Sequence, residues 1–574
     1  MNPNAPSSFP RLLSLDACRG FVMICLSFGG FGVAAGAADR AKDTAPFAIP
    51  TFHCLGIYWS PPGGAADKAA QVRYRREGAT EWKEGLPMRY NPIPKTDQDL
   101  ADYRGSIVNL TPGATYEIAL TLPGTATRAT LTSTTWSETF PLGATVKVAD
   151  QDTPLEIKES GTPQAWRVYD GKGATIDVRH QHNQCILVNA SYVILRGLIL
   201  KGAGAGENSS SPPIGAIQIE EGHDIVIEDC DISDWGRRNP KTGFGFNRDS
   251  AIYSRQSSLK RLIVQRCRLH HPRWDGSTWY EPKYPTHTAG PQCITLDGNS
   301  AGSHVIRYNE IWSDLEHMYN DPIGGGSNGS FRGAPGPDSD IYCNVVSHCW
   351  DDGIEAEGGS RNVRIWGNYV TQAMNMIGNA PASIGPLYIW RNVVGRSQWQ
   401  PGGKGGNFLK MGFADSEDWM TGPMYIFHNT VFAEDGWLPE GGLGGKRIVK
   451  HTTTRNNILQ VRSPEGHSAS SDERNIDNDF DYDLYNGQIP KGSEANGVKG
   501  QPGYDAGAGY DPATKTGRFQ LRLGSPGLDA GVVVPNFSDG YHGTAPDTGA
   551  HERGDRPMTF GVSARWEPAS TSVR

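Results

Sequence analysis

The sequence has 574 residues, with 54 Lys and Arg against 62 Asp and Glu, and a formal net charge of −8. This charge gives no electrostatic basis for binding nucleic acid, and a charged fraction of only 20% excludes a disordered polyelectrolyte or a helical bundle. The 71 Gly and 39 Pro, together with many short Val/Ile runs, favour an all-β chain.

The first 38 residues have the pattern of a targeting segment. An apolar, uncharged run over residues 20–38 follows Arg11 and Arg19, and it ends in the small-x-small triplet Ala35-Gly36-Ala37. This arrangement is typical of a secretory signal peptide. Residues 1–38 are therefore predicted to be a signal peptide or a membrane anchor. Both alternatives place the rest of the chain in a secreted, periplasmic or cell-surface location.

Short alternating strands separated by turns follow from residue 51. The alternation places Ile57 and Trp59 on one face, as expected of a half-buried strand. The segment LTPGATYEIAL, from Leu110 to Leu120, resembles the E–F region of fibronectin type III domains, in which a leucine, a proline turn and a tyrosine recur in this order. The resemblance implies a small fibronectin type III-like β-sandwich over residues 51–136, to which we assign no chemistry.

A looser repeat begins near residue 140 and determines the predicted fold. Nine segments share alternating apolar residues, then a small or polar residue, one spacer and another apolar residue. The small or polar position falls at Gly197, Cys230, Cys267, Asn309, Asn344, Asn368, Asn392, Asn429 and Asn457. The shortest interval is 24 residues, which is typical of a solenoid whose coils carry inserted loops. Each Asn is expected to bond the backbone at a corner and to stack on the Asn of the next coil.

The order strand, turn, strand and Asn corner resembles that of pectate-lyase-like β-helices. The segment from Phe519 to Gly554 is also similar to the closing segment of many bacterial β-helix enzymes, so Asp529, Asp547 and Glu552 are interpreted as fold-closing residues. The resemblance implies a right-handed parallel β-helix over residues 140–554, followed by a C-terminal tail over residues 555–574.

Seven cysteines lie beyond the targeting segment, and the sequence contains neither a CxxC motif nor Cys/His spacing of the metal-binding type. An odd number argues against a complete disulfide framework. Buried free thiols are therefore expected.

The period of two within each strand predicts which side chains point outward into a substrate groove. In GIEAEGG, Ile354 and Ala356 point inward, so Glu355 and Glu357 point outward. Asp297 occupies the position equivalent to Glu357 in an earlier coil. If no groove strand intervenes, these two carboxylates lie about 5 Å apart, because neighbouring coils are separated by about one strand spacing.

Two adjacent aspartates open the same strand. The segment DDGIEAEGGSRNVRI resembles the aspartate-pair segment of polygalacturonases, and this resemblance implies that Asp351 and Asp352 provide a general acid and position water. The Gly-His-Gly, Arg-Ile-Lys and Asn-Thr-Asp motifs of that family are not found in the expected places. The alternative interpretation is ordinary turn chemistry followed by solvent-facing Glu residues. The predicted catalytic residues are Asp297, Asp351, Asp352, Glu355 and Glu357.

Two long insertions, one before Cys293 and one before Ile341, are rich in aromatic and polar residues, and long loops on a rigid scaffold often carry function. Their aromatic side chains could stack on sugar rings. Together with outward residues of the groove, the predicted substrate-binding residues are Tyr253, Arg255, Trp274, Trp279, Tyr280, His317, Asp321 and Lys410.

Three functions remain open from the sequence. The first is a secreted polysaccharide-degrading glycoside hydrolase that uses paired carboxylates. The second is a polysaccharide lyase acting by β-elimination on a uronate-containing glycan, with Lys410, Arg255 or Tyr253 as the base. The third is a non-catalytic carbohydrate-binding surface protein. No cofactor is required by these readings, although Ca²⁺ could bind the acidic residues. The expected partner is a polysaccharide, with a possible membrane tether through the N-terminal segment.

Overall fold

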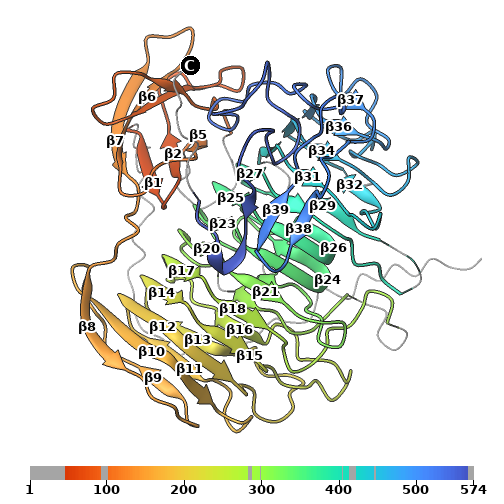
Figure 1. The fold of residues 1–574 in the computed structure, drawn as a ribbon. Coiled ribbons are helices and arrows are strands. Elements are labelled where there is room, and N and C mark those ends of the chain that lie inside the picture. Colours follow the sequence, from red (N-terminus) through yellow and green to blue (C-terminus); the bar gives the residue numbers. More distant parts are fainter. Residues whose placement is uncertain are drawn as a thin grey trace, which may run out of the picture. The chain divides into compact units, whose positions relative to one another are not determined.

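The computed structural model describes residues 45–91, 101–281, 287–297, 299–326, 328–401, 403, 405–412, 422–444 and 448–566 (Figure 1). Over these ranges the chain is all-β, and the one regular helix is the 3₁₀ helix η2 (Gly561–Ser563). In the same ranges, no helix has the length and apolarity needed to cross a membrane. The predicted signal peptide or anchor over residues 1–38 lies outside the described residues.

The N-terminal part forms two small antiparallel sheets. One has the order β1 (Phe47–Pro50), β2 (Leu55–Trp59) and β5 (Tyr103–Ile107); the other has the order β4 (Lys83–Glu84), β3 (Gln71–Arg76), β6 (Thr115–Thr121) and β7 (Arg128–Thr134). Ile57 and Trp59 lie in the core between them, as the alternation predicts. The fibronectin type III likeness itself stays a prediction.

Strands β8 to β37 belong to one parallel sheet of 30 strands. This sheet forms a β-helix, because the chain visits three columns in turn and each strand pairs with its counterpart in the next coil. Column one contains β9 (Leu155–Ile157), β11 (Ile186–Asn189), β13 (Gly215–Glu221), β16 (Ser250–Ser254), β19 (Ile294–Leu296), β22 (Ile323–Gly324), β24 (Val345–Glu355), β26 (Tyr369–Asn379), β29 (Asn407–Met411) and β32 (Gly441–Leu443).

Columns two and three complete each coil. Column two contains β8 (Leu142–Lys147), β10 (Trp166–Asp177), β12 (Val193–Lys201), β14 (Ile225–Glu228), β17 (Leu262–Gln265), β20 (Val305–Arg307), β23 (Asp340–Tyr342), β25 (Val363–Trp366), β27 (Leu387–Trp390), β30 (Met424–Phe427), β33 (Thr452–Arg455) and β35 (Asp479–Phe480). Column three contains β15 (Asp231–Ser233), β18 (Arg268–His270), β21 (Glu310–Trp312), β28 (Val393–Val394), β31 (Thr430–Val431), β34 (Ile458–Leu459), β36 (Leu484–Tyr485) and β37 (Val498–Lys499), together with the first halves of β24 and β26. Figure 1 shows this stack running from β8 and β9 to β36 and β37.

The predicted asparagine corners between columns two and three form a continuous ladder. We call it the asparagine ladder; its members are Asn309, Asn344, Asn368, Asn392, Asn429, Asn457 and the terminal Asp483. In each coil the backbone N–H of the Asn donates to the side-chain oxygen of the next member, as from Asn344 to Asn368 at 3.1 Å. The side-chain amide of Asn368 also donates to Ile341 O at 2.9 Å. The ladder therefore locks the register of seven successive coils.

The inward aliphatic residues of successive coils form one continuous core, which contains Ile294, Ile323, Ile354 and Ile377. Such burial is the main stabilising contribution in a solenoid. The seven described cysteines are all buried and free, which confirms the expectation of unpaired thiols.

The parallel ladder ends at Lys499, short of the expected boundary at residue 554. The chain then forms a three-stranded antiparallel sheet of β38 (Gly509–Asp511), β39 (Thr516–Arg518) and β40 (Met558–Thr559), so part of the predicted tail is incorporated into the fold. The carboxylates of Asp529, Asp547 and Glu552 accept hydrogen bonds from backbone N–H groups of this segment, consistent with a fold-closing role.

Side chains of the N-terminal sheets bond directly to the β-helix. Tyr58 OH donates to Asp338 at 2.8 Å, and Arg104 Nε donates to Gly385 O at 3.1 Å. Glu138 accepts two hydrogen bonds from the buried Arg307. The first two contacts join the N-terminal sheets to turns between columns one and two, and the third joins the segment after β7 to β20 in column two.

We expect Asn368→Ala to lower the free energy of unfolding by about 3 kcal/mol, because it leaves buried donors and acceptors of two neighbouring coils without partners. Urea titration followed by circular dichroism measures the change. Asn189→Ala is the control, since Asn189 lies on β11 outside the asparagine ladder. Equal midpoints for the two variants would contradict a stabilising role of the ladder.

Candidate active site

A second polar ladder lies at the corner where the chain enters column one. In five successive coils, one polar residue stands two positions before an inward aliphatic residue. These residues are Gln292, Asp321, Asp352, Asn375 and Asn407. We call it the mixed ladder. Amides form three of its rungs, and carboxylates form the two adjacent rungs Asp321 and Asp352.

Hydrogen bonds connect the rungs of the mixed ladder from coil to coil. Gln292 Nε2 donates to Asp321 Oδ2 at 2.9 Å, and the backbone N–H of Asp352 donates to Asp321 Oδ1 at 3.0 Å. Asn375 Nδ2 donates to Asp352 Oδ1 at 3.0 Å, and Asn407 Nδ2 donates to Asn375 Oδ1 at 3.2 Å. Asp321 and Asp352 are thus held in fixed positions, one strand spacing apart.

Strict alternation would turn Asp352 into the core, because it lies two residues before the inward Ile354. The chain turns a corner here instead. A Cβ at Gly353 would lie 2.6 Å from Val370 Cγ1, so Gly353 faces the core as Ile354 does, and Met376–Ile377 and Phe408–Leu409 face the core as successive pairs in the following coils. This corner leaves Asp352 on the outward side, where it meets Lys410.

The outward residues at the end of β24 and just beyond it continue the acidic surface. As the alternation predicts, Ile354 and Ala356 lie in the core, while Glu355 and Glu357 do not. Glu355 accepts hydrogen bonds from Gly325 N at 3.1 Å and Asn328 Nδ2 at 3.0 Å. Glu357 lies 3.0 Å from Lys410 Nζ, and this ammonium also pairs with Asp352.

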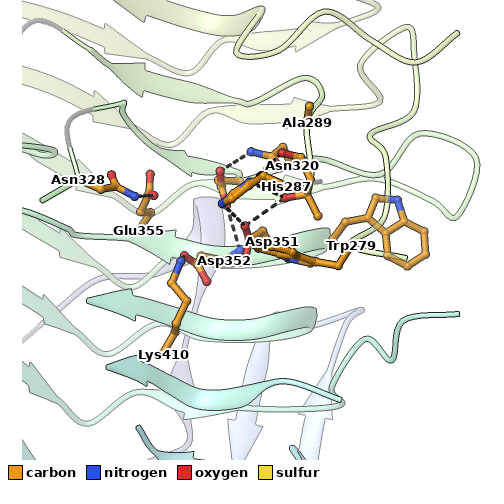
Figure 2. A network of polar contacts seen from close by, with 12 residues as sticks. Trp279, His287, Ala289, Asn320, Asn328, Asp351, Asp352, Glu355 and Lys410 are labelled. Atoms are coloured by element: carbon orange, nitrogen blue, oxygen red, sulfur yellow. Dashed lines mark hydrogen bonds and ion pairs between the residues drawn. The ribbon is translucent and has the colours of Figure 1, made fainter. Parts of the chain in front are cut away.

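Asp351 lies beside the mixed ladder and faces the first long insertion. Its carboxylate accepts hydrogen bonds from Thr288 Oγ1 at 3.1 Å and Asn375 Nδ2 at 3.4 Å, and His287 Nε2 lies 3.8 Å away. The ring of Trp279 packs on that of His287, with centroids 4.3 Å apart. Figure 2 shows His287 and Trp279 beside Asp351, with Lys410 reaching toward Asp352 from β29, which is separated from β24 by β26. We call Asp321, Asp351, Asp352, Glu355, Glu357 and Lys410 the acidic cluster.

The electrostatics of the acidic cluster favour protonated carboxyl groups near neutral pH. Burial raises the pKa of Asp321 and of Asp352 well above 3.8, and neighbouring carboxylates raise both further against the opposing charge of Lys410. Burial likewise raises the pKa of Glu355 and of Glu357 from 4.5 to about 7, again opposed by Lys410. Five carboxyl groups surround one ammonium, so ionising all of them at once costs free energy through mutual repulsion.

The charged form of Lys410 is stabilised by the same carboxylates. Burial alone would lower the pKa of Lys410, but Asp352 and Glu357, followed by Asp351 and Glu355, raise it well above 10.5. The lysine therefore stays charged, and it provides the neutralising group that the sequence did not indicate.

Two groups of carboxylate oxygens in the acidic cluster lie within 4.8 Å of one another: Asp321, Asp351 and Asp352, and Asp352, Glu355 and Glu357. In the second group the Lys410 ammonium already contacts Asp352 and Glu357, so it occupies the place of a cation. The first group offers hard oxygen donors of the kind that Ca²⁺ prefers, although Ca²⁺ takes about six to eight oxygens. Ca²⁺ binding stays a prediction for that first group.

The prediction that Asp297 and Glu357 are nearest neighbours is wrong. The register does make them equivalent, but β22 lies between their coils, because Ile294 pairs with Ile323 and Ile323 pairs with Ile354. Asp297 instead binds Arg248 Nη1 at 2.6 Å and accepts a hydrogen bond from Tyr253 OH at 3.2 Å. Of the predicted catalytic residues, Asp297 alone lies apart from the others.

The structure disperses most of the predicted substrate-binding residues. Asp321 and Lys410 belong to the acidic cluster, and Trp279 borders it through His287. Trp274 packs against the guanidinium groups of Arg238 and Arg273. His317 pairs with Asp314 at 2.9 Å, and Arg255 and Tyr280 are exposed.

Sequence reasoning missed the amide and hydroxyl partners of the cluster, chiefly Gln292, Asn375 and Thr288, and it placed Asp321 with the binding residues. One signal was present: in five coils a Gln, Asp or Asn stands two residues before an inward aliphatic residue. Recognising it requires the register of all five coils. Thr288 and His287 belong to an insertion, so their approach to Asp351 has no periodic signal.

Comparison with known proteins gives little further information. No family model and no curated protein matches the chain. Among solved structures, it is similar to the catalytic unit of a thermostable GH87 alpha-1,3-glucanase from Streptomyces thermodiastaticus strain HF3-3, with 13% identity, a TM-score of 0.31 and coverage of 78% of this chain and 86% of that chain. A TM-score this low does not transfer that enzyme's activity to this chain.

The raised pKa values of Glu355 and Glu357 predict how stability depends on pH. Between pH 4.5 and about 7 the folded protein holds protons that the unfolded chain releases, so these two groups make the free energy of unfolding fall as pH rises through this window. The variant carrying Glu355→Gln and Glu357→Gln should therefore lose less stability than the wild type over the window, as measured by urea midpoints.

The buried histidines His304 and His428 titrate in the wild type and in the variant alike, so the difference between the two proteins isolates the glutamates. Glu77→Gln, at an exposed position, is the control. Parallel pH curves for wild type and double variant would show that the two glutamates ionise normally.

Proposed function

We propose that this protein is a glycoside hydrolase that cuts a polysaccharide at the acidic cluster. The observation that supports this most strongly is the place of the carboxylates. Asp321, Asp351 and Asp352 bring their oxygens within 4.8 Å of one another in a buried site. Asp321 and Asp352 are rungs of the mixed ladder, whose other rungs are amides. At Asp352 a single oxygen accepts the hydrogen bond from Asn375, and the oxygen of an amide could do the same without repelling its neighbours, so the ladder itself does not require a carboxylate at this rung.

The chemistry of glycoside hydrolysis needs a proton donor and a carboxylate. The Asp321–Asp352 pair, whose pKa values are raised by burial and by their carboxylate neighbours, retains a proton that it can give to the leaving oxygen. Asp351 is the base or nucleophile, because it stands off the ladder and its lone pairs face the insertion that carries Thr288. Glu355 and Glu357 offer acceptors for sugar hydroxyls along the same face.

Elimination is less well supported, because Lys410 and Tyr253 hold their protons and Arg255 forms no hydrogen bond or ion pair with the acidic cluster among the described residues. Lys410 is an ammonium paired with Asp352 and Glu357. Burial and the nearby Asp297 raise the pKa of Tyr253, whose hydroxyl donates to that carboxylate. A lyase needs one of these groups to accept a proton from the sugar.

A location outside the cytoplasm is part of the same proposal, and it rests on the targeting pattern in the sequence of residues 1–38.

We expect Asp351→Asn and Asp352→Asn to lower kcat by about 10²–10⁴-fold on the polysaccharide that the wild type degrades. A polysaccharide panel assayed for new reducing ends and for the ultraviolet absorbance of unsaturated products identifies that substrate. Reducing ends without absorbance indicate hydrolysis, whereas both together indicate elimination. Because Asn375 and Asn407 are rungs of the same ladder, Asp352→Asn should fold, and its urea midpoint checks this.

Asp297→Asn is the matched control, because Asp297 is an outward carboxylate of the same column that lies outside the acidic cluster. It should retain activity within about tenfold of the wild type. Full activity of Asp351→Asn would refute the assignment of the site, and the absence of any product from the whole panel would favour the carbohydrate-binding alternative.

A further inference from the structure

A cavity of about 290 Å³ lies beside the turn that follows β24 and Glu357. Its walls come from the turns between columns one and two in successive coils, at residues 299–301, 331–337 and 359–361. Because coils repeat at about one strand spacing, the cavity extends along the axis of the solenoid. Its volume is near the lower end for small-molecule sites, about 300 Å³, and fits one sugar unit rather than a long oligosaccharide.

Glycines hold the cavity next to the acidic cluster. Gly333 forms an antiparallel bridge with Gly358, and a Cβ at Gly333 would lie 2.0 Å from Glu357 O. Both glycines have positive φ, at 114° and 100°. The loop therefore lies directly against the backbone that follows Glu357, and the cavity wall begins two residues later at Gly359.

The charge of the cavity is opposite to that of the acidic cluster. Arg332 and Arg361 line it, and none of its described lining residues is Asp or Glu. Arg332 is exposed, and within the described part of the chain its guanidinium has no hydrogen bond or ion pair. The charge of Arg361 also acts on the buried Asp338, so Arg332 supplies most of the uncompensated charge. Phe331 adds an aromatic surface of the kind that packs on a sugar ring.

We infer that this cavity binds an acidic sugar unit, one that carries a carboxylate or a sulfate, of the polysaccharide cut at the acidic cluster. A guanidinium binds either anion through charge-assisted hydrogen bonds. The inference rests on the proposed hydrolase function and narrows it, because it makes the substrate an acidic polysaccharide. The cavity binds the anionic group at a distance from the carboxylates, which would otherwise repel it.

The experiment measures the binding of three probes to the full chain by NMR titration: glucuronate, glucose 6-sulfate and, as the neutral reference, glucose. Glucuronate or the sulfate ester should bind more tightly than glucose, and the difference should shrink with added salt. Arg332→Gln should weaken the binding of the anionic probe at least about tenfold, as expected for the loss of a charge-assisted contact. The preferred anion distinguishes a uronate from a sulfated unit.

Arg128→Gln, at an exposed arginine on β7, should leave the affinity unchanged, and Asp351→Asn should still bind the probe. The two measurements test the two proposals separately. Loss of hydrolysis in Asp351→Asn tests the acidic cluster, whereas binding of the probes tests the cavity. If glucose binds as tightly as the anionic probes, if none of the probes binds, or if Arg332→Gln leaves the affinity unchanged, the inference is overturned.

Discussion

The asparagine ladder is the interaction on which the rest of the structure depends. The residue before each rung has a left-handed backbone, with φ of 58° at Tyr308, 54° at Cys343 and 51° at Arg391. For a residue other than glycine this conformation costs about 1–2 kcal/mol. The buried amide of each rung, bonded to the backbone of its own corner and to the next rung, offsets that cost. Coils of unequal length consequently meet at the same corner, and insertions of any length leave the register unchanged.

The mixed ladder at the entrance to column one uses the same principle with a different outcome. Where the rungs are Gln292, Asn375 and Asn407, the ladder is a structural device. Where they are Asp321 and Asp352, the same geometry holds two carboxylates in contact with a third, Asp351, and their burial raises the cost of ionising them together. In a repeat fold, few substitutions are needed to form such a site, because the scaffold already fixes the direction of the side chain at each rung.

The sequence was sufficient for the parts of the fold that repeat. The asparagine corners and the outward direction of Glu355 and Glu357 follow from spacing alone. The relation between coils was harder, because β22 is only the dipeptide Ile323–Gly324 and too short to show alternation; overlooking it made Asp297 seem a neighbour of Glu357. The orientation of Asp352 depends on the corner at which Gly353 and Ile354 both face the core, and its signal emerges only when the five coils are aligned. The approach of Thr288 depends on a loop and has no periodic signal.

The position of Lys410 shows how the acidic cluster depends on a missing side chain. The register places Gly378 between Glu355 and Lys410 on three adjacent strands of column one. A Cβ at Gly378 would lie 2.2 Å from Asp352 Oδ2, in the space that this carboxylate occupies. With glycine there, the ammonium reaches back across one coil to Asp352 and Glu357. The lysine then fixes two of the five carboxyl groups and remains too strongly paired to act as a base. The glycine, by admitting the ammonium, therefore favours acid chemistry over elimination at this site.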